Sequence, residues 1–229
     1  MKYNFKNCRV VINAGTEVLK IDGMGAPARE TPAHEMAGVN IQRTYEDYSV
    51  FMANLDGVKI GDRVKLPRIT TPSMKYGGMN FEELDLEEYA TVYDMDESNI
   101  HLVFDRAIMQ SAIDNDYNEN KAFKDTPLGQ WLNDTLNGAM IDAGIPAADC
   151  GLLRKDELWG DNAKPFFKDG RNRVCFDKEE DCSIWYWTET VENASAARFC
   201  YADYSGSSHY YGASSASYYV RPRFIILKS

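Results

Sequence analysis

The sequence predicts an α+β fold, with helix in the middle of the chain and a meander of short strands towards its end. Two observations predict it: an amphipathic helical pattern follows Thr126, and from Cys150 onward short apolar and aromatic runs alternate with turn residues. The 229 residues are 44% apolar, which is ordinary for a folded chain with a core. This length allows one large domain, or one domain with a small extension.

The central helix has clear start signals. Thr126 is a suitable N-cap, and Pro127 takes the first helical position, where its missing N–H costs no hydrogen bond. Apolar residues then recur three and four positions apart, which places one face in the core: Leu128, Trp131, Leu132 and Leu136. Gly138 weakens the end of this helix. A second, shorter helix is predicted over 107–113.

Strand-like runs lie on both sides of the helix. The predicted strands cover 9–13, 17–21, 58–66, 100–104 and 183–188. Residues 1–57 are accordingly interpreted as a short β-rich N-terminal extension.

The end of the chain predicts a hairpin and a last strand. Segments 196–204 and 207–211 are expected to pair around Gly206, because glycine accepts the positive φ of tight hairpin turns. The last strand is predicted over 219–227. Pro222 cannot donate a ladder hydrogen bond, so an edge position or a bulge is expected there.

Charge and hydropathy argue against some partners. The net charge of −10 disfavours nucleic acid and anionic lipid surfaces. No apolar run approaches the roughly 20 residues of a membrane helix, so membrane insertion is not expected. The first residues also lack the apolar core of a signal peptide, which predicts synthesis in a cytoplasm and leaves export within a virus particle open.

Motifs for catalysis or metal binding are scarce. The five cysteines are spaced without a CxxC pair and are expected to be free buried thiols, with a Cys175–Cys182 bridge left open. The segment 114–120 resembles the start of a calcium loop, but Glu119 and Asp125 stand where glycine and glutamate are required. We therefore expect a polar turn there, no metal, no cofactor and no enzymatic activity.

One stretch departs from ordinary composition. Residues 201–219 comprise six Tyr, six Ser, three Ala, two Gly, one Asp and one His. Tyrosine gives rigid amphipathic contact area while serine and glycine give adaptable hydrogen bonds, as in antibody binding loops. A disordered low-complexity tail and an ordinary exposed hairpin are the alternatives. The apolar flanks, 185–187 and 224–227, argue against disorder because they would fix both ends in a core.

The residues around this stretch resemble a known family. Trp187-Thr188-Glu189-Thr190, Asn193-Ala194-Ser195-Ala196-Ala197-Arg198, Gly206 and Val220-Arg221-Pro222 are similar to the C-terminal pattern of variable proteins of diversity-generating retroelements. Upstream pieces resemble a bacterial domain that shares its fold with formylglycine-generating enzymes: 61–64, 101–104, 128–133 and 152–157. The resemblance covers about 58–229 and implies a C-type-lectin-like domain there, with a variable region at about 185–219.

The resemblance implies a diversified binding surface. In such systems an error-prone copy alters template adenines, so that the altered codons cannot encode Trp, Met, Lys, Gln or Glu, and none of these five occurs in 201–219. The ligand would be a protein or another surface ligand whose identity the sequence does not give. From the family and from alternation around Gly206, the expected ligand-binding residues are Tyr201, Asp203, Tyr204, Ser207, His209, Tyr210, Tyr211, Ala213, Ser215, Tyr218 and Tyr219.

Two departures and two alternatives accompany the resemblance. Arg223 follows the Val-Arg-Pro motif where the family often has Val, and the absence of an export signal favours a phage or prophage protein, such as a tail component. One alternative is a structural phage or surface component with a fixed interface in a homo-oligomer. The other is an enzyme of the formylglycine-generating type, which would need a reactive pair such as Cys175 and Cys200.

Overall fold

A computed structural model describes residues 41–117, 121–177, 182–192 and 197–228. The chain mixes helix and sheet, as the α+β prediction expects, and strands make up the larger share. The strands predicted at 9–13 and 17–21 lie outside the described residues. None of the described helices is both long and apolar enough to cross a membrane.

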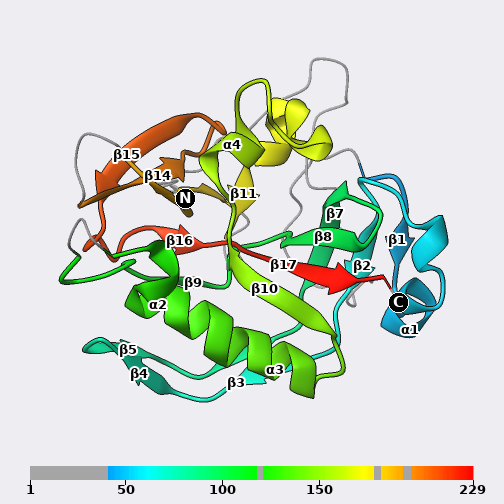
Figure 1. Ribbon diagram of the computed structural model, residues 1–229, viewed down its shortest axis with the longest axis horizontal. Coiled ribbons are helices and arrows are strands. Elements are labelled where there is room, and N and C mark those ends of the chain that lie inside the picture. The colour runs from blue at the N-terminus through cyan, green and yellow to red at the C-terminus, as the bar shows by residue number, and fades with distance from the viewer. Residues whose placement is uncertain (1–40, 118–120, 178–181, 193–196, 229) are drawn as a thin grey trace, which may run out of the picture.

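A six-stranded sheet forms one side of the molecule (Figure 1). Its order is β1 (Thr44–Tyr45), β2 (Arg63–Lys65), β7 (Tyr89–Met95), β8 (Asn99–Phe104), β17 (Pro222–Leu227) and β10 (Ala147–Leu152). The strand predicted at 100–104 is confirmed, and the one at 58–66 is shorter than expected. Of the edge position or bulge expected around Pro222, the edge position is wrong, because β17 lies between β8 and β10, whereas the pairing of β17 with β10 does shift register, between Ala148 and Gly151. Pro222 is tolerated as the first residue of its strand.

A five-stranded sheet carries the hairpin (Figure 1). Its order is β15 (Ser208–Gly212), β14 (Arg198–Ala202), β13 (Tyr186–Val191), β16 (Tyr219–Val220) and β9 (Met109–Gln110). The chain passes from this sheet to the other at Arg221, a buried residue between β16 and β17. Its Nε donates to the Phe104 carbonyl at 2.9 Å, and its guanidinium lies 5.4 Å from the centre of the Tyr186 ring. One buried cation therefore bridges the two sheets.

The central helix follows the prediction. It runs through α2 (Pro127–Gln130), a π-helical stretch (Trp131–Leu136) and α3 (Asn137–Asp142). The Thr126 hydroxyl caps it by accepting from the Gly129 N–H at 3.1 Å. All four predicted core side chains are fully buried: Leu128, Trp131, Leu132 and Leu136. Figure 1 shows this helix alongside β10.

The helix predicted at 107–113 is wrong. Residues 109 and 110 form β9 and pair with β16, with Gln110 opposite Tyr219. The Ile108 and Ser111 N–H groups also donate to residues 220 and 218. A segment this short is compatible with either helix or strand on its own sequence. Its pairing with β16, more than a hundred residues later, makes it a strand.

Residues 44–57 pack onto the six-stranded sheet. Strand β1 pairs in parallel with β2, and Phe51 of α1 (Tyr48–Met52) is fully buried in the main core. A short 3-10 turn, Leu55–Gly57, follows. The boundary at residue 58 stays a prediction for the chain as a whole, since residues 1–40 are not described.

Small elements complete the fold. Two hairpin pairs lie near the central helix: β3 (Ile69–Thr71) with β6 (Leu84–Leu86), and β4 (Met74–Tyr76) with β5 (Met79–Phe81). Helix α4 (Lys155–Leu158) and the strand pair β11 (Cys175–Phe176) and β12 (Ser183–Ile184) complete the set; Figure 1 shows α4 and β11 on the side of β10 that faces away from the central helix. The remaining 3-10 turns are Phe123–Asp125, Pro165–Lys168 and Gly170–Arg173.

Candidate functional site

The predicted hairpin is present. Strands β14 and β15 pair over five residues, and the turn between them closes with the Gly206 N–H donating to the Asp203 carbonyl at 2.9 Å. Gly206 has φ of 80°, which explains the glycine. The Asp203 carboxylate accepts from the N–H groups of Ser205 and Ser207 at 2.8 and 2.9 Å. These hydrogen bonds fix the backbone conformation of the turn.

Strand alternation divides the hairpin into two faces. Tyr201 pairs with His209 and Phe199 with Tyr211, so these four side chains share one face. Cys200 pairs with Tyr210 and Ala202 with Ser208, and these four share the other. The division decides which tyrosines lie on the same surface.

The first face is an aromatic surface. We call it the aromatic face, and its members are Trp185, Trp187, Tyr201, Tyr204, His209, Tyr211 and Tyr218. Tyr218 is central: its ring centre lies 4.3 Å from that of Trp187, 4.6 Å from Tyr201 and 5.3 Å from Tyr211. The rings of Trp185 and Tyr204 stack at 6.4 Å with planes 24° apart. Such contacts hold the aromatic face as one packed unit.

The outer rings of the aromatic face are open to solvent. Trp185 is 42% exposed, Tyr204 53% and Tyr211 52%, whereas Tyr218 is 3% exposed beneath them. Burial, with the neighbouring Tyr201 hydroxyl, raises the pKa of Tyr218 above its ordinary value, so its phenol stays neutral. The aromatic face therefore presents exposed rings on a buried aromatic base, which suits a surface that takes part in binding.

The structure brings part of the predicted site together. Tyr204, Ser207, His209 and Tyr211 are exposed, while Tyr201, Asp203, Ser215, Tyr210 and Tyr219 are half-buried. The Asp203 carboxylate lies 3.1 Å from His209 Nε2 at the edge of the aromatic face. Tyr219 belongs to β16, where its N–H donates to the Trp185 carbonyl at 2.9 Å.

Three predicted positions lie apart from the exposed rings of the aromatic face. Ala213 is buried: its N–H donates to the Ala197 carbonyl, and its own carbonyl accepts from Ile113 and Asp114. Tyr218 is also buried and serves as the base of the aromatic face. Tyr210 lies on the other face of β15, where Lys155 Nζ contacts its hydroxyl at 3.0 Å. Alternation fails after Gly212 because the chain turns back towards β9 before entering β16.

Trp185 is the residue that sequence reasoning missed. It was grouped with Tyr186 and Trp187 as core, and both neighbours are fully buried, but Trp185 lies between β12 and β13 with its ring exposed. Its ring contacts Tyr201, Tyr204 and Tyr218. Strand alternation would place Trp185 on the same side as Trp187 and opposite Tyr186, so no local pattern separates Trp185 from its two buried neighbours.

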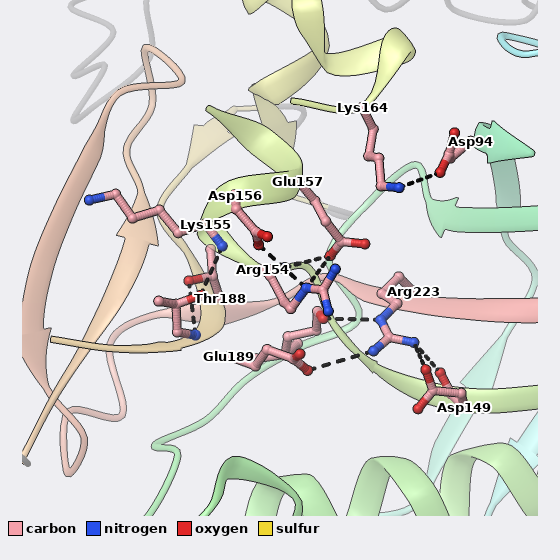
Figure 2. Close-up of polar contacts among 12 residues, drawn as sticks. Asp94, Asp149, Arg154, Lys155, Asp156, Glu157, Lys164, Thr188, Glu189 and Arg223 are labelled. Carbon is pink, nitrogen blue, oxygen red and sulfur yellow. Dashed lines mark hydrogen bonds and ion pairs between the residues drawn. The ribbon is translucent and has the colours of Figure 1, made fainter. Parts of the chain in front are cut away.

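A polar network centred on Arg223 joins β17 to β10 and β13 (Figure 2). Arg223 Nε donates to the Leu152 carbonyl at 3.1 Å, and its Nη1 contacts the Asp149 carboxylate. Its Nη2 lies 3.7 Å from the Glu189 carboxylate in β13. Burial raises the pKa of Glu189 to about 7, although Arg223 opposes this shift. Arg223, which departs from the pattern of the family that the sequence resembles, thus joins β10, β13 and β17 as a buried cation.

The same region holds α4 against the hairpin sheet. The Glu157 carboxylate accepts from the Arg154 N–H at 2.7 Å, and the Lys155 N–H donates to the Thr190 hydroxyl at 2.9 Å. The Thr188 hydroxyl in turn donates to the Cys200 carbonyl at 3.0 Å. Figure 2 shows Arg154, Lys155 and Glu157 together with Thr188 of β13. The network keeps the hairpin at a fixed position relative to the core.

The cysteines only partly follow the prediction. Cys150, Cys175 and Cys200 are free and buried, as expected. Cys182 is disulfide-bonded, which corrects the expectation of free thiols there, and a Cys175–Cys182 bridge is wrong because Cys175 is free. Burial raises the pKa of Cys175 and of Cys200 to about 11, so both stay protonated thiols near neutral pH.

The calcium-like segment has another explanation. The Asp114 carboxylate is buried and pairs with Lys121 Nζ at 2.6 Å, and it also accepts from the Asp116 N–H at 2.9 Å. Residues 118–120 lie outside the described residues. In the part of the chain that the structure describes, no three His, Cys, Asp or Glu side chains gather as metal ligands.

Comparison of the chain with protein-family models, with curated proteins and with solved structures finds no match. The resemblance to variable proteins of diversity-generating retroelements therefore stays a prediction from the sequence motifs.

Proposed function

We propose that this protein binds a ligand through the aromatic face. The observation that carries the proposal is the convergence of exposed rings from separate segments, Trp185, Tyr204 and Tyr211, on a buried base formed by Trp187 and Tyr218. Large aromatic side chains held rigidly over a packed base supply contact area at little cost in conformational entropy. Binding surfaces draw most of their energy from a few such residues.

The proposal includes the diversification that the sequence resemblance implies. On this account the fold is C-type-lectin-like, and the codons for exposed residues of the aromatic face are varied by adenine-directed copying. Trp185 is a fixed member, because altered codons of that kind cannot encode tryptophan. Support comes from the hairpin, whose strands pair through backbone bonds and not through the side chains at positions 204, 209 and 211, and from the buried rings of Trp187 and Tyr218 beneath the exposed ones. No catalytic step is proposed.

Sequencing the DNA downstream of the gene tests this function without knowledge of the ligand. We expect an imperfect copy of the last hundred or so bases, next to a reverse-transcriptase gene. Mismatches at template adenines should fall on the codons of Tyr201, Tyr204, His209 and Tyr211, and should spare those of Ala202 and Val220, which are buried. No copy, or mismatches spread evenly over buried and exposed codons, would remove the diversified-binder account. A fixed oligomeric interface would then become the better explanation of the exposed rings.

A further inference from the structure

We infer that the aromatic face of this chain recognises a protein surface that presents arginine or lysine side chains. The inference deepens the proposed function and rests on it. It starts from two properties of the aromatic face that both favour a cation: no cation among the described residues covers its rings, and a carboxylate lies at its edge.

The first property is the free ring surface. Four cations of the described chain lie over tyrosine rings, at 4.0 to 5.4 Å from the ring centres: Arg43 over Tyr45, Arg63 over Tyr89, Lys155 over Tyr210 and Arg221 over Tyr186. None of those rings belongs to the aromatic face. The rings of Trp185, Tyr204 and Tyr211 each contact another ring of the aromatic face, and the exposed part of each remains open to a cation from outside.

The second property is the fixed negative charge of Asp203. Partial burial works to raise the pKa of this carboxyl, but hydrogen bonds from Ser205 and Ser207 outweigh it and hold the pKa below its ordinary value. The carboxylate is therefore ionised near neutral pH. It lies beside His209, whose ring centre is 5.6 Å from that of Tyr201, so the charge stands at the edge of the aromatic face.

Other cations that touch the hairpin are already engaged. Arg198 pairs with the Glu192 carboxylate at 3.1 Å, and Arg173 donates to the Phe167 carbonyl at 2.9 Å. Lys155 contacts Tyr210 on the other face of β15. With a net charge of −10, the whole chain also attracts a basic partner and repels an acidic one. Local and overall charge thus select the same class of ligand.

Arginine matches both properties at once. Its planar guanidinium can stack on a Tyr or Trp ring while its N–H groups donate to a carboxylate. A lysine ammonium can approach a ring face or donate to the carboxylate, but each interaction is weaker, since the ammonium is a compact and strongly hydrated charge. A glutamate would meet the Asp203 carboxylate and the negative ring faces, so it should be rejected.

The test uses peptides of one design on the immobilised full-length chain. Four peptides, (Gly-Ser-X)4 with X as arginine, lysine, norleucine or glutamate, are compared by surface plasmon resonance at neutral pH. We expect arginine to bind best, at roughly fivefold or more over norleucine, and glutamate to bind least. Added salt should reduce the arginine preference, because salt screens the attraction between a charge on the peptide and the Asp203 carboxylate at the protein surface.

Three variants separate site recognition from general acidity. Tyr204→Leu keeps an apolar side chain but loses the ring, and Asp203→Asn keeps an acceptor for the turn but loses the charge; each should reduce the arginine preference at least twofold. Asp161→Asn removes the same charge at an exposed site outside the aromatic face and should leave it unchanged. Equal binding of arginine and norleucine peptides overturns the inference, as does an equal effect of Asp161→Asn and Asp203→Asn. A DNA copy found together with either result would leave the diversified-binder proposal standing and reject only the ligand class.

Discussion

Trp185 and Trp187 show how two residues of one type can have opposite roles. Trp187 is fully buried; its indole N–H donates to the Ser111 carbonyl at 2.9 Å, and its ring packs on Tyr218 at 4.3 Å. Trp185 leaves 42% of its surface open, and its contacts are with other rings of the aromatic face. Trp187 supports the aromatic face from beneath, whereas Trp185 is part of its exposed surface.

This difference predicts opposite results for the two alanine variants. Trp187→Ala should lower the free energy of unfolding by about 3–5 kcal/mol, because it opens a cavity and leaves a buried carbonyl unpaired. Trp185→Ala should lower it by less than about 1 kcal/mol and weaken ligand binding instead. Urea unfolding of both variants measures the stability part. A larger loss for Trp185→Ala than for Trp187→Ala would place Trp185 in the core and contradict the site.

Glu189 makes stability depend on pH. Its pKa is raised from 4.5 to about 7 in the folded protein, so the folded state binds more protons than the unfolded state between these values. Stability should therefore fall as pH rises from about 4.5 to 7, by at most about 3 kcal/mol, since one pKa unit corresponds to about 1.4 kcal/mol. Arg223 already opposes this rise in the pKa, and the partial exposure of Glu189 reduces the effect on stability further.

The variant Glu189→Gln should remove this part of the pH dependence and raise stability at pH 8. Urea midpoints between pH 4.5 and 8 measure it. Glu82→Gln is the matched control at an exposed carboxyl and should leave the pH profile unchanged. Parallel profiles for the wild type and Glu189→Gln would show that Glu189 does not titrate in this window.

At the scale of elements, local signals predicted local structure. The cap at Thr126 and the turn at Gly206 depend on residues close in sequence, and both are present. Strand β9 was missed because only its pairing with β16 makes it a strand. The sequence predicted only part of the aromatic face. Its composition indicated residues 201–219. The burial of Tyr218 and the exposure of Trp185 could not be predicted, because they follow from packing between distant segments.

Two glycines of the central helix should respond in opposite ways to alanine. A Cβ at Gly129 would lie 2.0 Å from the Phe123 carbonyl oxygen, so Gly129→Ala should destabilise the protein by about 2 kcal/mol or more. A Cβ at Gly138 meets nothing within 4 Å, so Gly138→Ala should stabilise it by about 0.5–1 kcal/mol. Thermal unfolding of the two variants measures both. Destabilisation by Gly138→Ala would mean that the helix needs this glycine for a reason other than space.

At the scale of the whole molecule, the fold separates support from surface. The two sheets meet at Arg221, which bonds to the end of β8 and lies over the first residue of β13. Arg223, two residues later, joins β17 to β10 and β13 from within the polar network. The hairpin strands extend from this support, with the aromatic face on one side and Lys155 on the other. Changes on the aromatic face should therefore leave the support intact.

Two matched libraries test that separation most directly. One randomises the exposed positions Tyr204, Ser207, His209 and Tyr211 with NNY codons; the other randomises Ala202, Ala213, Tyr218 and Val220, which are buried in the same segment. Both are displayed on cells and scored by resistance to protease. We predict that most members of the first library stay as resistant as the parent chain and that most members of the second do not. Equal loss in both libraries would contradict the account, because the side chains of the aromatic face would then be part of what holds the fold together.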